Sequence, residues 1–391
     1  MRTQPWCHAD PRLRPSTEEP AVVPPSSGYR CRGCHGTELA PVLDLGLVPA
    51  ADYFPLASTP VGLAETAHPL RMDLCAHCGL AQLAEDDTRT EEPRGIEPAA
   101  LREQAAAAVA KVAESGLLRG KTVREFGSPH GGTWLPLLTE RGYLPTGDVA
   151  DVVLDCFGLM HEPDQRAAFA ERAAATAPDG LLLIQFHSLA TIVATGQWNA
   201  LRHGHFAYYS LSALARLLER AGMSITTAWR FDLYGGTVLV AARHGTHRPD
   251  AATYEIRRQE DRYTEPAAVR RLQQAADGHA EALRRWLTRH AIQGDRVYAY
   301  GAASRAVALF SLAGVDRGLI TAVADAAPAK QGHRMPGTDV PIIAPGELVA
   351  ARPDLVLLTL PDLLPEVRAR YPELDGCWIV DNPADSTVRG G

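Results

Sequence analysis

Two pairs of cysteines constrain the N-terminal part of this chain more than any other feature. Cys31 and Cys34 form the first CxxC pair, Cys75 and Cys78 form the second, and 40 residues separate the pairs. Each pair can direct two thiolates at one tetrahedral ion, and four thiolates complete its coordination shell. The surrounding block, residues 29–92, is too small to form a stable core alone. We predict that these four cysteines bind one structural zinc ion, with four reduced core thiols as the alternative.

Length and composition limit the classes of protein to consider. The chain has 391 residues, which fits two or three domains. Its formal net charge is −7 and its basic residues are not clustered, so nucleic acid is not expected as a partner. No apolar run approaches the roughly 20 residues that a membrane helix requires. The first 28 residues contain six prolines and no apolar signal segment, and we expect a disordered tail on a soluble, cytoplasmic protein.

Strand and helix patterns alternate through the remainder of the chain. Residues 122–126 read as a strand, and a glycine-rich turn and a helical segment follow. A second strand, glycine and helix unit lies at residues 296–313, after a long helical linker. The pattern predicts an α/β fold in which the small zinc-binding N-terminal lobe precedes two Rossmann-like α/β domains. We place these domains at residues 93–253 and 254–391.

The first glycine-rich turn has the outline of a binding site for S-adenosylmethionine (SAM). Glu125 closes the strand, and Gly127 and Gly131 would let the backbone approach a ligand. We assign these three residues to cofactor binding. A glycine turn alone is a weak signal, and a tight βα turn without a ligand is the alternative.

The segment after this turn is short for a complete SAM domain. Such a domain needs a second strand whose terminal acid binds the ribose, and a third strand beside the adenine. Only 29 residue steps separate Val123 from Val152, which leaves room for one crossover. Asp148 and Asp151 remain as ribose acceptors, although turn and strand-start roles are favoured for both. We therefore expect SAM to bind weakly or not at all.

Further motifs give the chain a family resemblance. They are Leu159–Pro163, Arg202–Phe206, Tyr234–Gly236, Tyr300–Arg305, Ala324–Asp325, Pro328–Gly332 and Pro336–Thr338. With the cysteine pairs and the glycine turn, they occur in the order seen in sugar C-methyltransferases, and the chain resembles that family from Cys31 onward. The resemblance implies a zinc-bearing lobe, a SAM domain and a C-terminal Rossmann-like domain. A nucleotide-linked 4-keto-deoxysugar is expected between the last two.

The resemblance also implies catalytic histidines. In this family a histidine removes the proton beside the ketone, and His205 matches that base, while His161 matches a second active-site histidine. Imidazole suits the step because its unperturbed pKa is near neutrality. His203 is a further candidate, and a solvated or core pair is the alternative for His203 and His205. The chain departs from the family in having Arg202, His203 and Gly204 where a tyrosine and two acids precede the base.

The C-terminal half contains the elements of a nucleotide site. Gly301 stands between a strand and a helix whose first amides can meet a diphosphate, and Arg305 adds a guanidinium there. Asp325 follows the next strand, where Rossmann-like domains place a ribose acceptor, and Lys330 lies on the same loop. A Rossmann-like domain with an empty crevice is the alternative. The predicted substrate-binding residues are Arg202, Tyr234, Gly301, Arg305, Asp325 and Lys330.

These features lead to three functional hypotheses. The first is a SAM-independent enzyme that acts on a nucleotide-linked keto-deoxysugar, with dTDP as the expected nucleotide. Histidine-mediated proton transfer beside the ketone would then give epimerisation or isomerisation. The second is a SAM-dependent sugar C-methyltransferase. The third is a non-catalytic partner protein that binds a nucleotide sugar.

Overall fold

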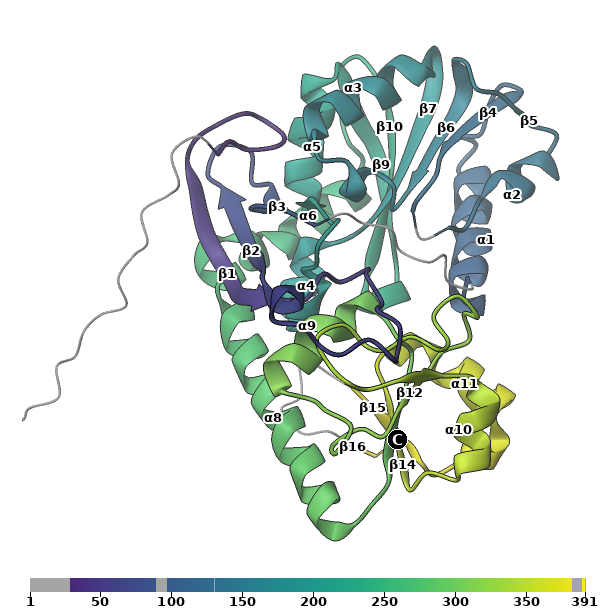
Figure 1. Cartoon of the computed structure of the whole chain (residues 1–391). Coiled ribbons are helices and arrows are strands. Elements are labelled where there is room, and N and C mark those ends of the chain that lie inside the picture. Colours follow the sequence, from purple (N-terminus) through teal and green to yellow (C-terminus); the bar gives the residue numbers. More distant parts are fainter. Residues whose placement is uncertain (1–28, 89–96, 130, 382–388, 391) are drawn as a thin grey trace, which may run out of the picture.

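The computed structural model describes residues 29–88, 97–129, 131–381 and 389–390, and the predicted tail lies outside them (Figure 1). Three sheets follow one another along the chain, one in a small N-terminal lobe and two in α/β layers. The predicted fold class, an α/β chain with a four-cysteine lobe and two Rossmann-like domains, is confirmed. Among the helices of these ranges, none is long and apolar enough to cross a bilayer.

The N-terminal sheet is antiparallel and takes one strand from the next domain. Its own strands are β1 (Leu39–Val48), β2 (His68–Cys75) and β3 (Ala81–Leu83). The fourth strand, β8 (Ala207–Tyr208), pairs with β3 through Ala81 and Gln82. Because β8 directly follows the histidine motif at 202–206, the zinc-binding lobe anchors that motif.

The middle sheet has the order β5-β4-β6-β7-β10-β9. Strands β4 (Thr122–Phe126), β6 (Ala150–Cys156) and β7 (Thr176–His187) are parallel. Strands β9 (Met223–Phe231) and β10 (Thr237–His244) form an antiparallel pair at one edge, and β10 is also antiparallel to β7.

Helices cover both faces of the middle sheet. On one face, α1 (Ala99–Glu114) and α2 (Leu135–Thr139) pack on alternate residues of the strands. The other face is covered by α3 (Gln165–Ala175) and α5 (Leu211–Arg220). Burial on both faces explains the continuous apolar run at 181–184 of β7, which is typical of a covered parallel strand.

Two local predictions are corrected. The segment between β4 and β6, predicted as a loop, contains the two-residue strand β5 (Leu144–Pro145) parallel to β4, so the second strand survives as a stub. The single helical linker is broken into α6 (Ala251–Thr264), α7 (Pro266–Val269) and α8 (Arg271–Gln293). The break follows from Pro266, which forces the preceding residue into an extended conformation.

The C-terminal sheet has the order β13-β12-β11-β14-β15-β16. Strands β11 (Val297–Tyr300), β12 (Val323–Ala324), β13 (Ile342–Ile343), β14 (Leu355–Leu358) and β15 (Trp378–Val380) are parallel, and β16 (Arg389–Gly390) is antiparallel. Its helices are α9 (Ser304–Ala313), α10 (Pro345–Ala351) and α11 (Leu364–Arg370). In both α/β sheets the strand order reverses beside the first strand, and ligands of such sheets bind at the carboxyl ends there.

Candidate functional site

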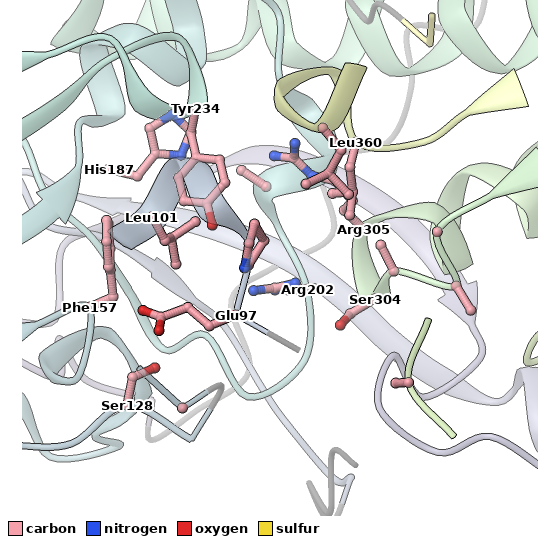
Figure 2. Close-up of a pocket in the computed structure, with 18 of the residues that line it drawn as sticks. Glu97, Leu101, Ser128, Phe157, His187, Arg202, Tyr234, Ser304, Arg305 and Leu360 are labelled. Carbon is pink, nitrogen blue, oxygen red and sulfur yellow. The ribbon is translucent and has the colours of Figure 1, made fainter. Parts of the chain in front are cut away.

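A cavity of about 300 Å³ lies between the two α/β domains, at the switch points of both sheets. Its volume is at the lower end of the range usual for small-molecule sites. In Figure 2, Glu97 and Ser128 lie on one side of this space, and Ser304 and Arg305 on the other. The middle domain contributes Ser128, Gly131, Phe157, His187, Arg202, His205 and Tyr234, and the C-terminal domain contributes Gly301, Ser304, Arg305, Asp325 and Lys330.

The structure brings two of the predicted histidines together at this cavity. His205 lies in the cavity wall, and its Nε2 accepts a hydrogen bond from Nε of Arg202 over 2.7 Å. His161 packs edge-on against His205, with 4.4 Å between the ring centroids, and its Nδ1 lies 3.0 Å from the carbonyl oxygen of Gly204. His161 is behind His205 rather than in the cavity lining. It can orient the His205 ring.

His203 lies on the other side of the same loop. Its ring is fully buried against the N-terminal lobe, 6.0 Å from His68, and Nε2 lies 3.2 Å from the carbonyl oxygen of Pro69. Burial lowers the pKa of His203 and favours the neutral ring. His203 does not line the cavity, so the structure gives it a place in the core between the lobes rather than at a substrate.

A buried ion pair holds the turn that carries His161. Asp155, at the end of β6, accepts the backbone N–H groups of Gly158 and Leu159 at 2.9 and 2.8 Å. Its other oxygen lies 3.0 Å from Nε of Arg172. Burial raises the pKa of Asp155 to about 6, although the guanidinium of Arg172 opposes that shift. This pair connects α3 to the strand end beneath His161.

The glycine turn predicted for SAM is largely filled by the protein itself. The Glu125 carboxylate accepts the backbone N–H of Trp134 at 2.6 Å and the hydroxyl of Thr133, and burial raises its pKa. A Cβ atom on Gly132 would lie only 2.7 Å from Oε1 of Glu97. The space lined by Glu125 and Gly127 is about 30 Å³, enough for about one or two water molecules.

The two alternative ribose acceptors lie away from this space. Asp151 accepts the backbone N–H groups of Lys121 and Thr122 at 2.7 and 3.0 Å, which places it at the amino ends of β4 and β6. Asp148 is exposed in the turn after β5 and lines neither cavity. Asp151 therefore has the strand-start role that the sequence favoured.

The C-terminal wall of the cavity depends on a braced backbone turn. Gly301 has φ +96°, and a Cβ atom there would lie 2.7 Å from Oγ1 of Thr359, so only glycine fits. Asp325 accepts the backbone N–H of Ala302 at 2.8 Å, and Nζ of Lys330 donates to the carbonyl oxygen of Ala302 at 2.9 Å. Asp325 and Lys330 line the cavity, and these hydrogen bonds shape the turn.

Cationic groups dominate the space beside that turn. Arg305 lies in the first turn of α9, and Nη2 is 3.4 Å from Oε1 of Gln197. Burial lowers the pKa of Arg305, and the charge of nearby Arg202 adds to the effect. Two guanidinium groups near the start of a helix favour an anionic ligand.

Two residues of the opposite wall have a strained backbone. Phe157 and Tyr234 have φ values of 62° and 56°, in the left-handed region that bulky residues rarely adopt. Their rings meet edge-on, with 6.0 Å between centroids, and both side chains line the cavity (Figure 2). Such strain is concentrated at functional sites in proteins. Tyr234 thus lies where the sequence predicted a substrate contact.

Sequence reasoning missed His187, Asn199 and Tyr208, which also line the cavity. His187 could have been found, because it ends the apolar strand β7, and carboxyl strand ends form the ligand crevice of α/β sheets. Asn199 and Tyr208 precede and follow the histidine motif, and no spacing rule identifies them.

The four predicted zinc ligands form a separate cluster in the N-terminal lobe. The Sγ atoms of Cys31, Cys34, Cys75 and Cys78 all lie within 4.8 Å of one another. Cys31 and Cys78 are 3.5 Å apart at sulfur, as are Cys34 and Cys75. These distances fit one tetrahedral ion with bonds of about 2.3 Å, and all four positions of its shell would be sulfur. Zinc here would stabilise the lobe and leave no position for a substrate.

Three family models match the chain in the order of its sheets. They are a zinc binding domain at residues 31–91, a methyltransferase domain at 144–228 and a C-methyltransferase C-terminal domain at 232–383. Together these matches make the chain similar to C-methyltransferases over most of its length. Its methyltransferase match begins beyond the glycine turn at 127–132. The C-methyltransferase NovU of Streptomyces niveus is 27% identical over 417 aligned residues, which cover 92% of this chain and 96% of NovU.

Solved structures of methyltransferases match smaller parts of this chain. Magnesium protoporphyrin IX methyltransferase from Synechocystis PCC 6803 has 16% identity and a TM-score of 0.29, over 39% of this chain and 90% of that one. Mitomycin 7-O-methyltransferase MmcR has 20% identity and a TM-score of 0.25, over 38% of this chain and 59% of that one.

Proposed function

We propose that this protein is a relative of the sugar C-methyltransferases that binds a nucleotide-linked keto-deoxysugar and moves a proton beside the ketone without SAM, as an epimerase or isomerase. One contrast carries the proposal. The cavity of about 300 Å³ joins His205 to the C-terminal nucleotide turn, whereas Glu125, Gly127 and Gly132 of the donor turn line only a space of about 30 Å³.

The C-terminal wall supports an anionic nucleotide ligand. The first amides of α9 and the guanidinium of Arg305 can bind a diphosphate, since charge-assisted hydrogen bonds to phosphate are strong. Gly301 lets the backbone come close, and Asp325 and Lys330 hold its turn in place. The nucleotide would lie against the C-terminal sheet, and the sugar would extend toward the middle domain.

The middle wall supports proton transfer. His205 would take the proton from the carbon beside the ketone, and the electron pair of that C–H bond would form an enolate. Arg202, 2.7 Å from His205, can stabilise the enolate oxygen with its guanidinium. Return of a proton from solvent to the other face of the same carbon gives the epimer. Where that carbon carries a hydroxyl group, protonation of the former ketone carbon with loss of the hydroxyl proton gives an isomer with the ketone on the neighbouring carbon. His161 would orient His205.

The donor turn supports a reaction without SAM. Glu125, the acid expected to face a ligand, is used to bind Thr133 and Trp134 at the start of α2. The second strand is reduced to two residues, and Asp151 lies at the wrong end of the sheet to reach a ribose. The two contacts expected with SAM, one from Glu125 and one from an acid to the ribose, would therefore be missing.

SAM-dependent methyl transfer is the second candidate, and one observation favours it. Ser128 and Gly131 of the donor turn line the large cavity as well as the small one, so a donor could enter from that side. The third hypothesis, a binding protein without activity, has the same nucleotide site but no proton transfer.

Solvent isotope exchange separates the three candidates. A dTDP-4-keto-deoxysugar is incubated with the protein in deuterated water, with and without SAM, and the sugar is analysed by mass spectrometry. Deuterium incorporation without SAM supports the proposal. A methylated product that forms only with SAM overturns it in favour of the second candidate, and a bound but unchanged sugar supports the third.

A further inference from the structure

His187 is a half-buried residue of the cavity wall whose ring nitrogen Nε2 is buried, and the proposed reaction does not use it. It ends β7 and is followed by Ser188, whose side chain caps α4 (Leu189–Ala194). Figure 2 shows the ring beside Tyr234, and the two ring centroids lie 6.1 Å apart. Within the described part of the chain, Nε2 of His187 is buried and has no hydrogen-bond partner. A buried polar atom without a partner costs free energy, so it requires an explanation.

The surroundings of His187 fix its protonation. The backbone of Tyr234 beside the ring acts in the opposite direction to burial and raises the pKa of His187, while Nε2 has no hydrogen-bond partner among the described residues. We assign the proton of the neutral ring to Nδ1, which leaves a lone pair on Nε2. Burial, aided by the charges of Arg305 and Arg202, lowers the pKa of His187 to about 3, so the ring stays neutral at physiological pH. Nε2 is thus a buried hydrogen-bond acceptor.

A second polar atom of the same wall also lacks a hydrogen-bond partner. Asn199 is 3% exposed, lines the cavity, and its Oδ1 has no hydrogen-bond partner among the described residues. An apolar ligand would leave both atoms unsatisfied. A cationic ligand group is disfavoured beside Arg202 and Arg305, which leaves neutral donors. Sugar hydroxyl groups have that chemistry.

We propose that His187 is a specificity-determining residue whose Nε2 accepts a hydrogen bond from a hydroxyl group of the sugar ring. The inference rests on the proposed nucleotide-sugar site and adds a requirement to it, since the sugar must keep a hydroxyl at the position that faces His187. A site built to pair a hydroxyl discriminates strongly against an analogue that lacks it, because its buried acceptor is then left unpaired.

Two variants test this inference. His187→Leu replaces the imidazole with an apolar side chain, so the acceptor is lost. His187→Gln keeps an acceptor, which is its amide oxygen. Calorimetry with dTDP, with dTDP-glucose and with dTDP-sugars that lack single hydroxyl groups gives the affinities. We expect His187→Leu to bind dTDP-glucose about tenfold more weakly and dTDP within about twofold of wild type. His187→Gln should keep most of the affinity for dTDP-glucose.

The deoxy-sugars provide the decisive comparison. One of them should bind wild type about tenfold more weakly than dTDP-glucose, and His187→Leu should bind both equally. Equal affinity of wild type and His187→Leu for every ligand would overturn the role of His187 alone. If wild type binds neither dTDP nor any dTDP-sugar, the proposed function itself fails. A melting curve for each variant establishes that it is folded before binding is measured.

Discussion

Nε of Arg202 donates to Nε2 of His205 at 2.7 Å, so the imidazole nitrogen that faces this guanidinium must be an acceptor. Arginine has donors and no acceptor, which fixes His205 in this state as a ring without a proton on Nε2. A base must be unprotonated before it acts, and the hydrogen bond from Arg202 keeps Nε2 of His205 unprotonated. An incoming diphosphate or ketone oxygen can attract the guanidinium and release Nε2 for the substrate.

The first prediction concerns the base. His205→Ala should lower turnover by about 10²- to 10⁴-fold, the usual contribution of a positioned proton-transfer group. Binding of dTDP should be nearly unchanged, because Gly301 and Arg305 lie on the other wall. Deuterium exchange and calorimetry provide the two measurements. His203→Gln is the matched control, since His203 belongs to the same loop but faces Pro69. Equal exchange in His205→Ala and wild type would place the base elsewhere.

A second prediction concerns SAM. Because Glu125 is occupied at the start of α2 and the second strand is a stub, we expect no SAM binding at micromolar concentrations. Titration calorimetry with SAM measures this, and titration of the same sample with a dTDP-sugar serves as the positive control. Micromolar affinity for SAM would contradict the prediction and favour the methyltransferase hypothesis.

The buried ion pair under His161 gives a third prediction. Arg172→Met should destabilise the protein by about 3–5 kcal/mol, because the Asp155 carboxylate is left buried without its cation. Urea unfolding at pH 7 measures the change. Arg124→Met is the control, since the pair of Arg124 with Glu171 at 3.8 Å is half-exposed and its other contact is with the Phe126 ring, and it should cost less than about 1 kcal/mol. Similar losses in both variants would mean that the Asp155 pair is unimportant for stability.

His187 gives a pH-dependence of stability. Its folded-state pKa is lowered to about 3 from an ordinary 6.5, so between these values the unfolded chain binds more protons than the folded one. The contribution of His187 to the free energy of unfolding therefore has its full value above pH 6.5 and is lost as the pH falls toward 3. Between pH 7 and pH 5 the loss should be about 2 kcal/mol. Urea unfolding of wild type at the two pH values measures it, and His187→Gln should lack this component. If the free energy of unfolding depends on pH identically in wild type and His187→Gln, the predicted contribution of His187 is refuted.

The fifth prediction concerns zinc. Cys75→Ser, or a strong chelator, should unfold the N-terminal lobe, because structural zinc binding contributes about 10–16 kcal/mol, as much as the whole stability of a typical domain. The loss should spread to the histidine motif, since β8 pairs with β3 of this lobe. Metal analysis and thermal melting test both points. Cys377→Ser is the control because Cys377 lies outside the cluster, and it should keep one zinc ion per chain.

The sequence by itself determined the features that depend on short spacing. Two thiols three residues apart can be ligands of one ion whatever the structure of the rest of the chain. The two CxxC pairs therefore predicted the four-cysteine cluster directly. A glycine between an apolar strand and a helix likewise predicted the turn at Gly301, because its geometry is local. The strand and helix pattern predicted the α/β class for the same reason.

Only the tertiary structure decided which side chains meet. His203 and His205 are two residues apart, yet β8 pairs with the N-terminal lobe and turns one toward Pro69 and the other toward the cavity. The sequence predicts that the carboxylate of Glu125 binds a ligand. In the structure this carboxylate instead accepts the backbone N–H of Trp134, nine residues later at the start of α2. Hydrogen-bond partners and burial depend on contacts between distant segments, and packing, not spacing, selects these contacts.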